Sequence, residues 1–120
     1  MSYIGEIAMA YADCWLDEDI ETKLSLRNLH FRSDAWLEAE SCHFLMTDIV
    51  PEYNEFDADR VFNELSGLDI QIQIARESSV CIYVKGNEVS LKNIERKGRK
   101  LLNAQECWRQ DDGTLRIWWD

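Results

Sequence analysis

The clearest pattern in the chain is an alternation of apolar and polar residues between positions 69 and 85. Isoleucine occupies every second position at Ile70, Ile72 and Ile74, which places all three on one face of a β-strand. After a short polar break, β-branched and aromatic residues resume from Val80 to Lys85. The stretch predicts an antiparallel hairpin with one face in the hydrophobic core. The other face, turned to solvent or to a partner, comprises Gln71, Gln73, Cys81 and Tyr83.

Four further stretches have apolar residues at spacings of three and four, the period of an amphipathic helix. They are residues 3–16, 34–49, 58–66 and 91–104. Ser33, Asp57 and Ser90 are placed to cap the last three helices, because short polar side chains accept hydrogen bonds from the free N–H groups of a first turn. Pro51 ends the second helix, since proline disfavours helical geometry in the residue before it.

The remaining segments complete the expected fold. Residues 20–32 fit a strand and a helix about equally, and we favour a strand or an irregular connection. A second hairpin is expected over residues 106–119, where Leu115, Ile117 and Trp119 share one face of the last strand. The order of elements predicts a single α+β domain, with a mostly antiparallel sheet of two hairpins covered by helices on one face.

Length and composition agree with one globular domain. The chain has 120 residues, of which 46% are hydrophobic, and it contains one proline and no low-complexity run. No basic residue precedes Lys23, so no secretory signal is recognisable, and no apolar run approaches the roughly 20 residues that span a bilayer. We therefore expect a cytoplasmic protein with reduced thiols. Its four cysteines are Cys14, Cys42, Cys81 and Cys107.

The charge of the chain is unevenly distributed. Residues 1–60 contain fourteen acidic and four basic residues, whereas residues 61–120 contain nine of each, so the first half carries the whole net charge of −10. Such a field disfavours direct contact with nucleic acid or an anionic membrane and favours a basic protein partner.

Catalytic and metal-binding patterns are weak. Cys42 and His43 are adjacent, but neighbours in a helix point in different directions, so adjacency does not indicate a nucleophile and its base. The scattered cysteines lack the spacing of a zinc site, and the carboxylates of residues 48–59 lack a calcium-loop pattern. We predict no catalytic residue, no metal and no cofactor.

Exposed aromatic side chains beside charged residues are typical of protein-binding hot spots. Trp118, by strand alternation, and Tyr53, by its acidic neighbours, are expected to be at least partly exposed. Glu52 and Glu55 have no evident structural role in the sequence. The predicted partner-binding residues are Asp17, Glu18, Asp19, Asp48, Glu52, Tyr53, Glu55, Asp59 and Trp118.

The predicted helix 91–104 carries the main basic cluster of the chain. Its members are Lys92, Arg96, Arg99 and Lys100. We favour a solvated outer face for this cluster, given the acidity of the whole chain. Contact with nucleic-acid phosphates and contact with the acidic half of a second copy, as in a homodimer, are the alternatives.

These patterns favour a small acidic inhibitor that occludes a basic, nucleic-acid-binding site on a partner such as a nuclease. An immunity protein against a bacterial toxin and a phage-encoded inhibitor of a nuclease or CRISPR complex share this nucleic-acid mimicry. The alternative is a small cytosolic enzyme or ligand-binding domain with its site between sheet and helices.

Overall fold

The computed structural model describes residues 30–53, 55–77 and 79–119. Its elements in chain order are β1 (His30–Arg32), α3 (Ala39–Ile49), β2 (Glu52–Tyr53), β3 (Phe56–Asp57), α4 (Ala58–Leu65), β4 (Ile70–Glu77), β5 (Val80–Gly86), α5 (Glu88–Leu101), β6 (Glu106–Arg109) and β7 (Leu115–Trp119). The predicted helix 3–16 and most of the ambiguous segment 20–32 lie outside the described residues.

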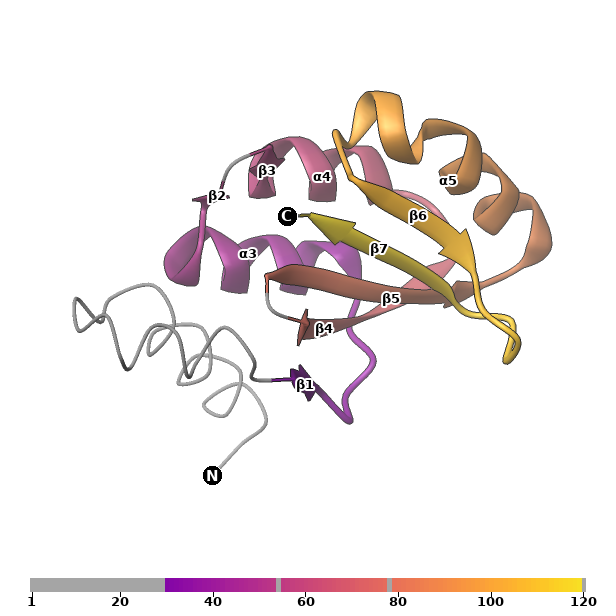
Figure 1. Ribbon diagram of the computed structural model, residues 1–120, viewed down its shortest axis with the longest axis horizontal. Helices are drawn as coiled ribbons and strands as arrows, with labels where there is room; N and C mark the ends of the chain where they lie inside the picture. Colours follow the sequence, from indigo (N-terminus) through magenta and orange to yellow (C-terminus); the bar gives the residue numbers. More distant parts are fainter. Residues whose placement is uncertain (1–29, 54, 78, 120) are drawn as a thin grey trace.

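Five strands form one antiparallel sheet in the order β1-β4-β5-β7-β6, and β2 pairs with β3 in a separate two-stranded ladder. Figure 1 shows α3, α4 and α5 together on one side of the five-stranded sheet. The predicted α+β domain with two hairpins and helices on one face is confirmed.

The alternating isoleucines determine the register of the central hairpin. Ile72 lies opposite Val84, and Ile74 lies opposite Ile82. Strand β7 continues the same wall, because Ile117 lies opposite Ile82. These five side chains are completely buried beneath the helices. The inward face is therefore the one that the sequence predicts.

An aromatic cluster joins the end of the sheet to helix α4. The ring of Trp119 meets the ring of Phe56 edge-on, with centroids 5.0 Å apart, and Phe56 meets Phe62 in the same way at 6.4 Å. The indole Nε1 of Trp119 donates a hydrogen bond of 2.9 Å to the carbonyl oxygen of Leu102. Trp119 is thus buried without leaving its polar atom unsatisfied.

The opposite face of the sheet differs from expectation. Gln71 is exposed, but Gln73, Cys81 and Tyr83 are buried. The guanidinium of Arg32 lies 3.8 Å from the centroid of the Tyr83 ring and donates a hydrogen bond of 2.5 Å to Gln73 Oε1. Strand alternation alone assigns these residues to an outer face. It contains no information about side chains of a distant strand, such as Arg32 of β1, that lie on this face.

The start of α3 also differs from the predicted boundary. The helix begins at Ala39, not at residue 34, because the segment before it runs along β4. Leu37 and Ile72 exchange backbone hydrogen bonds of 2.8 and 2.7 Å, which requires extended geometry at Leu37. Ser33 consequently does not cap the helix, and the N-cap position is occupied by Glu38 without a side-chain hydrogen bond.

The other helix boundaries follow local chemistry. Asp57 caps α4 as predicted, accepting a hydrogen bond of 3.2 Å from the Arg60 amide. Helix α5 begins at Glu88 rather than residue 91 because Asn87, and not Ser90, is its cap: Asn87 Oδ1 accepts from the Ser90 amide at 2.8 Å.

Helix α5 approaches strand β6 closely at one glycine. A Cβ atom at Gly98 would lie 2.5 Å from the Sγ of Cys107, a distance shorter than side chains tolerate. The missing side chain lets the helix lie directly on the strand. Cys42, Cys81 and Cys107 are free thiols, and Cys14 lies outside the described residues.

Candidate protein-binding surface

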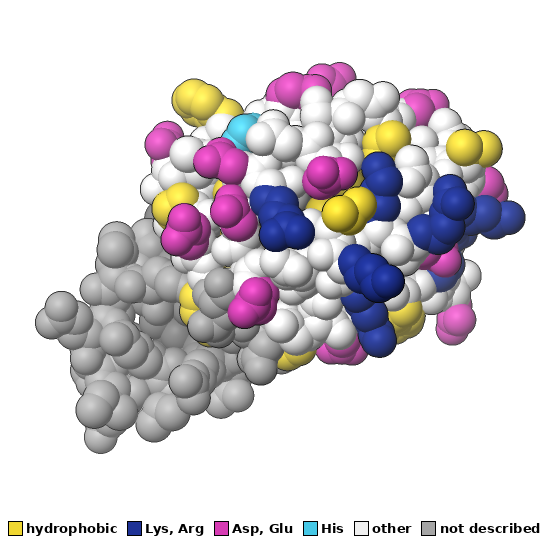
Figure 2. Space-filling model, turned by 90° about the horizontal axis from the view of Figure 1, so that it is seen from above, with side chains coloured by type: hydrophobic (Ala, Val, Ile, Leu, Met, Phe, Trp, Pro, Cys, Tyr) yellow, Lys and Arg dark blue, Asp and Glu magenta, His cyan; other side chains and the backbone are white. Residues whose placement is uncertain are grey.

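Exposed carboxylates gather where α3, α4 and the β2–β3 ladder meet the solvent. We call this set the acidic region: Glu40, Asp48, Glu52, Glu55 and Asp59. Figure 2 shows most Lys and Arg side chains of this face gathered toward one end of the molecule, whereas acidic side chains lie at both ends. The charge asymmetry of the sequence therefore persists as an asymmetry of the folded surface.

A large apolar side chain stands in the acidic region. Phe44 of α3 is 78% exposed. It borders an open concavity of about 400 Å³. The lining residues are Glu40, His43, Phe44, Thr47, Asp48 and Asp59. An exposed aromatic ring beside exposed carboxylates is the arrangement that the sequence predicted for Tyr53 and Trp118.

Phe44 is a residue that the sequence analysis missed, although a signal for it exists. The buried residues of α3 are Ala39, Cys42 and Met46. Phe44 is two residues after Cys42 and two residues before Met46. Because each helical residue advances by a little over a quarter turn, two residues advance by a little over half a turn, and Phe44 falls on the outer face. An apolar ring outside the buried stripe of an amphipathic helix is the feature to look for.

His43 links the two helices that carry the acidic region. Its Nε2 lies 2.6 Å from Asp59 Oδ1, and its ring stacks on that of Phe62 with centroids 6.4 Å apart. The Thr47 hydroxyl donates to the His43 backbone carbonyl at 2.7 Å. In the described part of the chain, no hydroxyl or thiol bonds to the second ring nitrogen. The pair positions the Asp59 carboxylate and provides no nucleophile.

Cys42 points the other way, into the core. Its side chain is fully buried, and burial, with a smaller contribution from Glu40, raises the pKa of the thiol from 9.0 to about 12. The thiol therefore stays protonated at neutral pH, which removes the form that attacks substrates or binds metals. Within residues 30–53, 55–77 and 79–119, no group of three or more His, Cys, Asp or Glu side chains could hold a metal ion.

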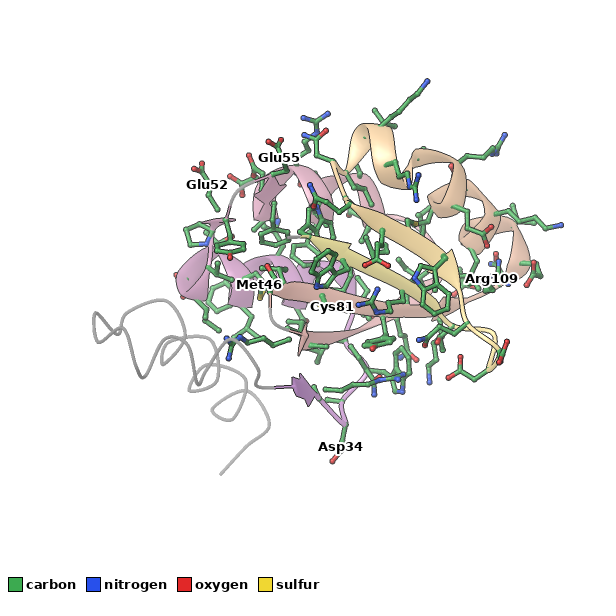
Figure 3. All side chains as sticks on the ribbon, in the orientation of Figure 1. Asp34, Met46, Glu52, Glu55, Cys81 and Arg109 are labelled. Carbon is green, nitrogen blue, oxygen red and sulfur yellow. The ribbon has the colours of Figure 1, made fainter. Side chains whose placement is uncertain are left out.

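The β2–β3 ladder explains the positions of Glu52 and Glu55, for which the sequence indicated no structural role. Glu52 lies opposite Asp57, and Tyr53 lies opposite Phe56, so the ladder turns between them. Figure 3 shows Glu52 and Glu55 projecting from this end of the molecule into solvent. Tyr53 is half-buried and packs against the main core. The ladder thus presents two carboxylates on a short, supported loop.

The structure does not bring all predicted residues together. Asp48, Glu52, Glu55 and Asp59 share the acidic region, with Tyr53 beneath it. Trp118 is half-buried on the opposite face of the sheet, against a separate cluster that contains Cys81. The helices that carry the acidic region cover the other face, so Trp118 is not part of this surface. Asp17, Glu18 and Asp19 lie outside the described residues.

A surface of opposite sign lies on α5. We call it the basic face: Lys92, Arg96, Arg99 and Lys100, all of which are exposed. The two acidic residues of the same helix are bound by Arg109 of β6, whose Nη1 lies 2.6 Å from Glu88 and whose Nη2 lies 2.7 Å from Glu95. This pairing lowers the pKa of Glu88 through its hydrogen bond to Arg109.

Comparisons with protein-family models, with curated proteins and with solved structures give no match to this chain. Among the described helices, none combines the length and the apolar character needed to cross a membrane. Functional inference therefore depends on the geometry and charge of the surface itself.

Proposed function

We propose that the chain is a protein-binding inhibitor whose acidic region occludes a basic, nucleic-acid-binding site on a partner protein. The observation that carries the proposal is Phe44, a 78% exposed ring surrounded by carboxylates. Carboxylates steer a positively charged partner toward this surface, and a desolvated aromatic anchor then slows dissociation. Together the two features give fast association and slow dissociation.

The proposal has two biological versions with the same physical basis. One is an immunity protein that neutralises a toxin nuclease, and the other is a phage-encoded inhibitor of a nuclease or CRISPR complex. In both, the carboxylates take the place of nucleic-acid phosphates at cationic side chains. The proposal includes a cytoplasmic location, supported by the three free thiols among the described cysteines.

The alternative function, an enzyme or ligand-binding domain with a site between sheet and helices, has less support. Such a site needs an enclosed pocket with reactive polar groups. The helix side of the sheet is filled by aliphatic and aromatic side chains, and the Cys42 thiol there is protonated at neutral pH. An open, acidic concavity around an aromatic ring matches a protein-binding surface better.

The test begins with affinity capture from an extract of the native host at low salt, followed by identification of the protein eluted as salt rises. We expect a basic nucleic-acid-binding protein, and a short nucleic acid should compete with the chain for it. Recovery of an acidic partner, or of a partner indifferent to nucleic acid, would contradict the proposal.

Matched variants then separate steering from anchoring. Glu52→Gln/Glu55→Gln removes two exposed charges from the acidic region and should slow association. The control Asp34→Asn/Asp111→Asn removes two exposed charges elsewhere and should leave the association rate close to wild type. Figure 3 shows Asp34 on the opposite side of the molecule from Glu52 and Glu55. Equal slowing by both pairs would mean that only net charge matters.

Phe44→Ala tests the anchor. The side chain is too exposed to support the fold, so the variant should remain as stable as wild type. We expect a faster dissociation rate, with a loss of about 2 kcal/mol or more in binding free energy if Phe44 is a hot spot. Surface-plasmon resonance with the captured partner measures both rates.

A further inference from the structure

The basic face of α5 has the composition that the acidic region needs in a partner. Arg109 binds both acidic residues of the helix, Glu88 and Glu95, so its positive charge offsets one of their two negative charges. The basic residues Lys92, Arg96, Arg99 and Lys100 have no ion pair with another described residue. Lys97, the remaining base of α5, lies 3.8 Å from Glu64 of α4.

The basic face also contains an exposed apolar residue. Val89 is 81% exposed and borders an open concavity of about 670 Å³ together with Lys92, Glu95 and Arg96. The acidic region has the same design with the opposite sign: Phe44 borders a concavity beside Asp48 and other carboxylates. Each surface therefore offers an apolar contact surrounded by charges that the other surface complements.

We propose that the basic face of one copy docks on the acidic region of a second copy of this chain. The two surfaces are different, so the contact is heterologous, and each docked pair leaves one acidic region and one basic face free. Charge complementarity and the two exposed apolar side chains identify the second copy as the occupant. The proposal concerns the acidic region described above but does not depend on its inhibitory role.

The net charge of −10 keeps this contact weak. Like-charged copies repel at long range, but at physiological salt charges are screened beyond about 8 Å, so the directly facing opposite charges dominate at contact. A partner protein with a stronger positive field would displace the second copy from the acidic region. Self-association and partner binding therefore compete for the same acidic region.

Sedimentation analysis of the purified chain tests the proposal directly. We expect the average mass to rise with protein concentration at about 0.15 M salt and to fall toward the monomer when the salt is raised several-fold. A wild-type chain that remains monomeric at several hundred micromolar at the lower salt concentration, on the order of the weak affinities of transient contacts, would overturn the proposal.

Two variants test the heterologous geometry. Lys92→Glu/Arg96→Glu removes the basic face, and Phe44→Ser/Asp48→Lys removes the acidic region; each should weaken self-association by at least about tenfold. Mixed together, they should form a one-to-one complex that cannot extend, since each retains the surface that the other lacks. Self-association that persists in either variant, or a mixture that stays monomeric, would contradict the proposal.

A control and a competing outcome complete the design. Asp34→Lys/Asp111→Lys changes two charges outside both surfaces and should leave head-to-tail association intact. A fluorescent single-stranded oligonucleotide tests a polyanion as the occupant of the basic face; tight binding by a monomeric wild type, lost in Lys92→Glu/Arg96→Glu, would replace the present proposal. Partner capture by Lys92→Glu/Arg96→Glu tests the inhibitory function separately, because its acidic region is unchanged.

Discussion

Helices α3 and α5 each bury one face against the same sheet, and each leaves large apolar side chains in solvent: Phe44 on α3, and Val89 and Leu101 on α5. They differ in whether a neighbouring element supplies an ion-pair partner for their acidic side chains. No described cation pairs with Asp48 on α3, whereas Arg109 of β6 reaches across to both acids of α5. The sign of a helix surface is therefore set by the strand beside it as well as by the helix's own sequence.

The largest expected effect concerns the sheet that both helices share. Ile82→Ala removes a fully buried side chain at the centre of the wall, between Ile74 and Ile117, and should lower the free energy of unfolding by about 2–4 kcal/mol. Urea unfolding monitored by tryptophan fluorescence measures the loss. Val89→Ala, at an exposed position, is the control and should leave the midpoint close to wild type. Similar midpoints for the two variants would show that Ile82 does not support a tightly packed wall.

A smaller effect is expected when the N-cap of one charged helix is removed at a time. Asp57→Ala removes the cap of α4, and Asn87→Ala removes the cap of α5; each should cost about 1 kcal/mol. Amide hydrogen exchange should accelerate mainly in the helix that loses its cap. If each variant accelerates exchange equally in both helices, then the two helices open as one cooperative unit. That result would contradict the expectation that the acidic region and the basic face open independently.

The smallest effect is the dependence of stability on pH that comes from the pairing of Glu88 on α5 with Arg109. The hydrogen bond to Arg109 holds the pKa of Glu88 below its ordinary value of 4.5 in the folded chain. The unfolded chain therefore binds the proton more readily, so this contribution to stability is present above the ordinary pKa and is lost as the pH falls through the folded pKa. The stability difference between wild type and Arg109→Gln should shrink on acidification.

Asp112 contributes to stability with the same dependence on pH as Glu88, because hydrogen bonds from Thr114 lower the pKa of its carboxyl group. Its contribution is common to wild type and Arg109→Gln and cancels in their difference. Denaturant unfolding of both proteins at neutral pH and at a pH of about 3 gives the measurement. A difference that stays constant between the two conditions would mean that Arg109 stabilises the fold only by packing.

Sequence patterns were most informative where short-range chemistry decides the structure. The isoleucine alternation predicted the register face of β4, and Asp57 predicted the start of α4. In both cases the sequence signal lies within the element or one residue beyond its end. Helix α3 began later than predicted because the pairing of Leu37 with Ile72 is a contact between distant segments, and no local pattern contains it.

The candidate surface was only partly predictable for the same reason. Exposed acids such as Glu52 and Glu55 were identified from charge, since the folded chain does not bury unpaired carboxylates. The coupling of His43 to Asp59, and that of Arg109 to Glu88, joins residues of different elements and requires the fold. Trp118 was grouped with the acids on exposure alone, but strand alternation places it on the opposite face of the sheet from α3 and α4.

The close contact between Gly98 and Cys107 turns one thiol into a reporter of local motion. Burial raises the pKa of Cys107 to about 11, with Glu95 adding to the increase and Arg99 opposing it, so alkylating reagents find little thiolate while α5 covers the strand. The rate at which Cys107 is labelled therefore reports how often α5 separates from β6. The fully buried Cys42 and Cys81 label only on larger openings, so one unmodified chain carries probes at different depths.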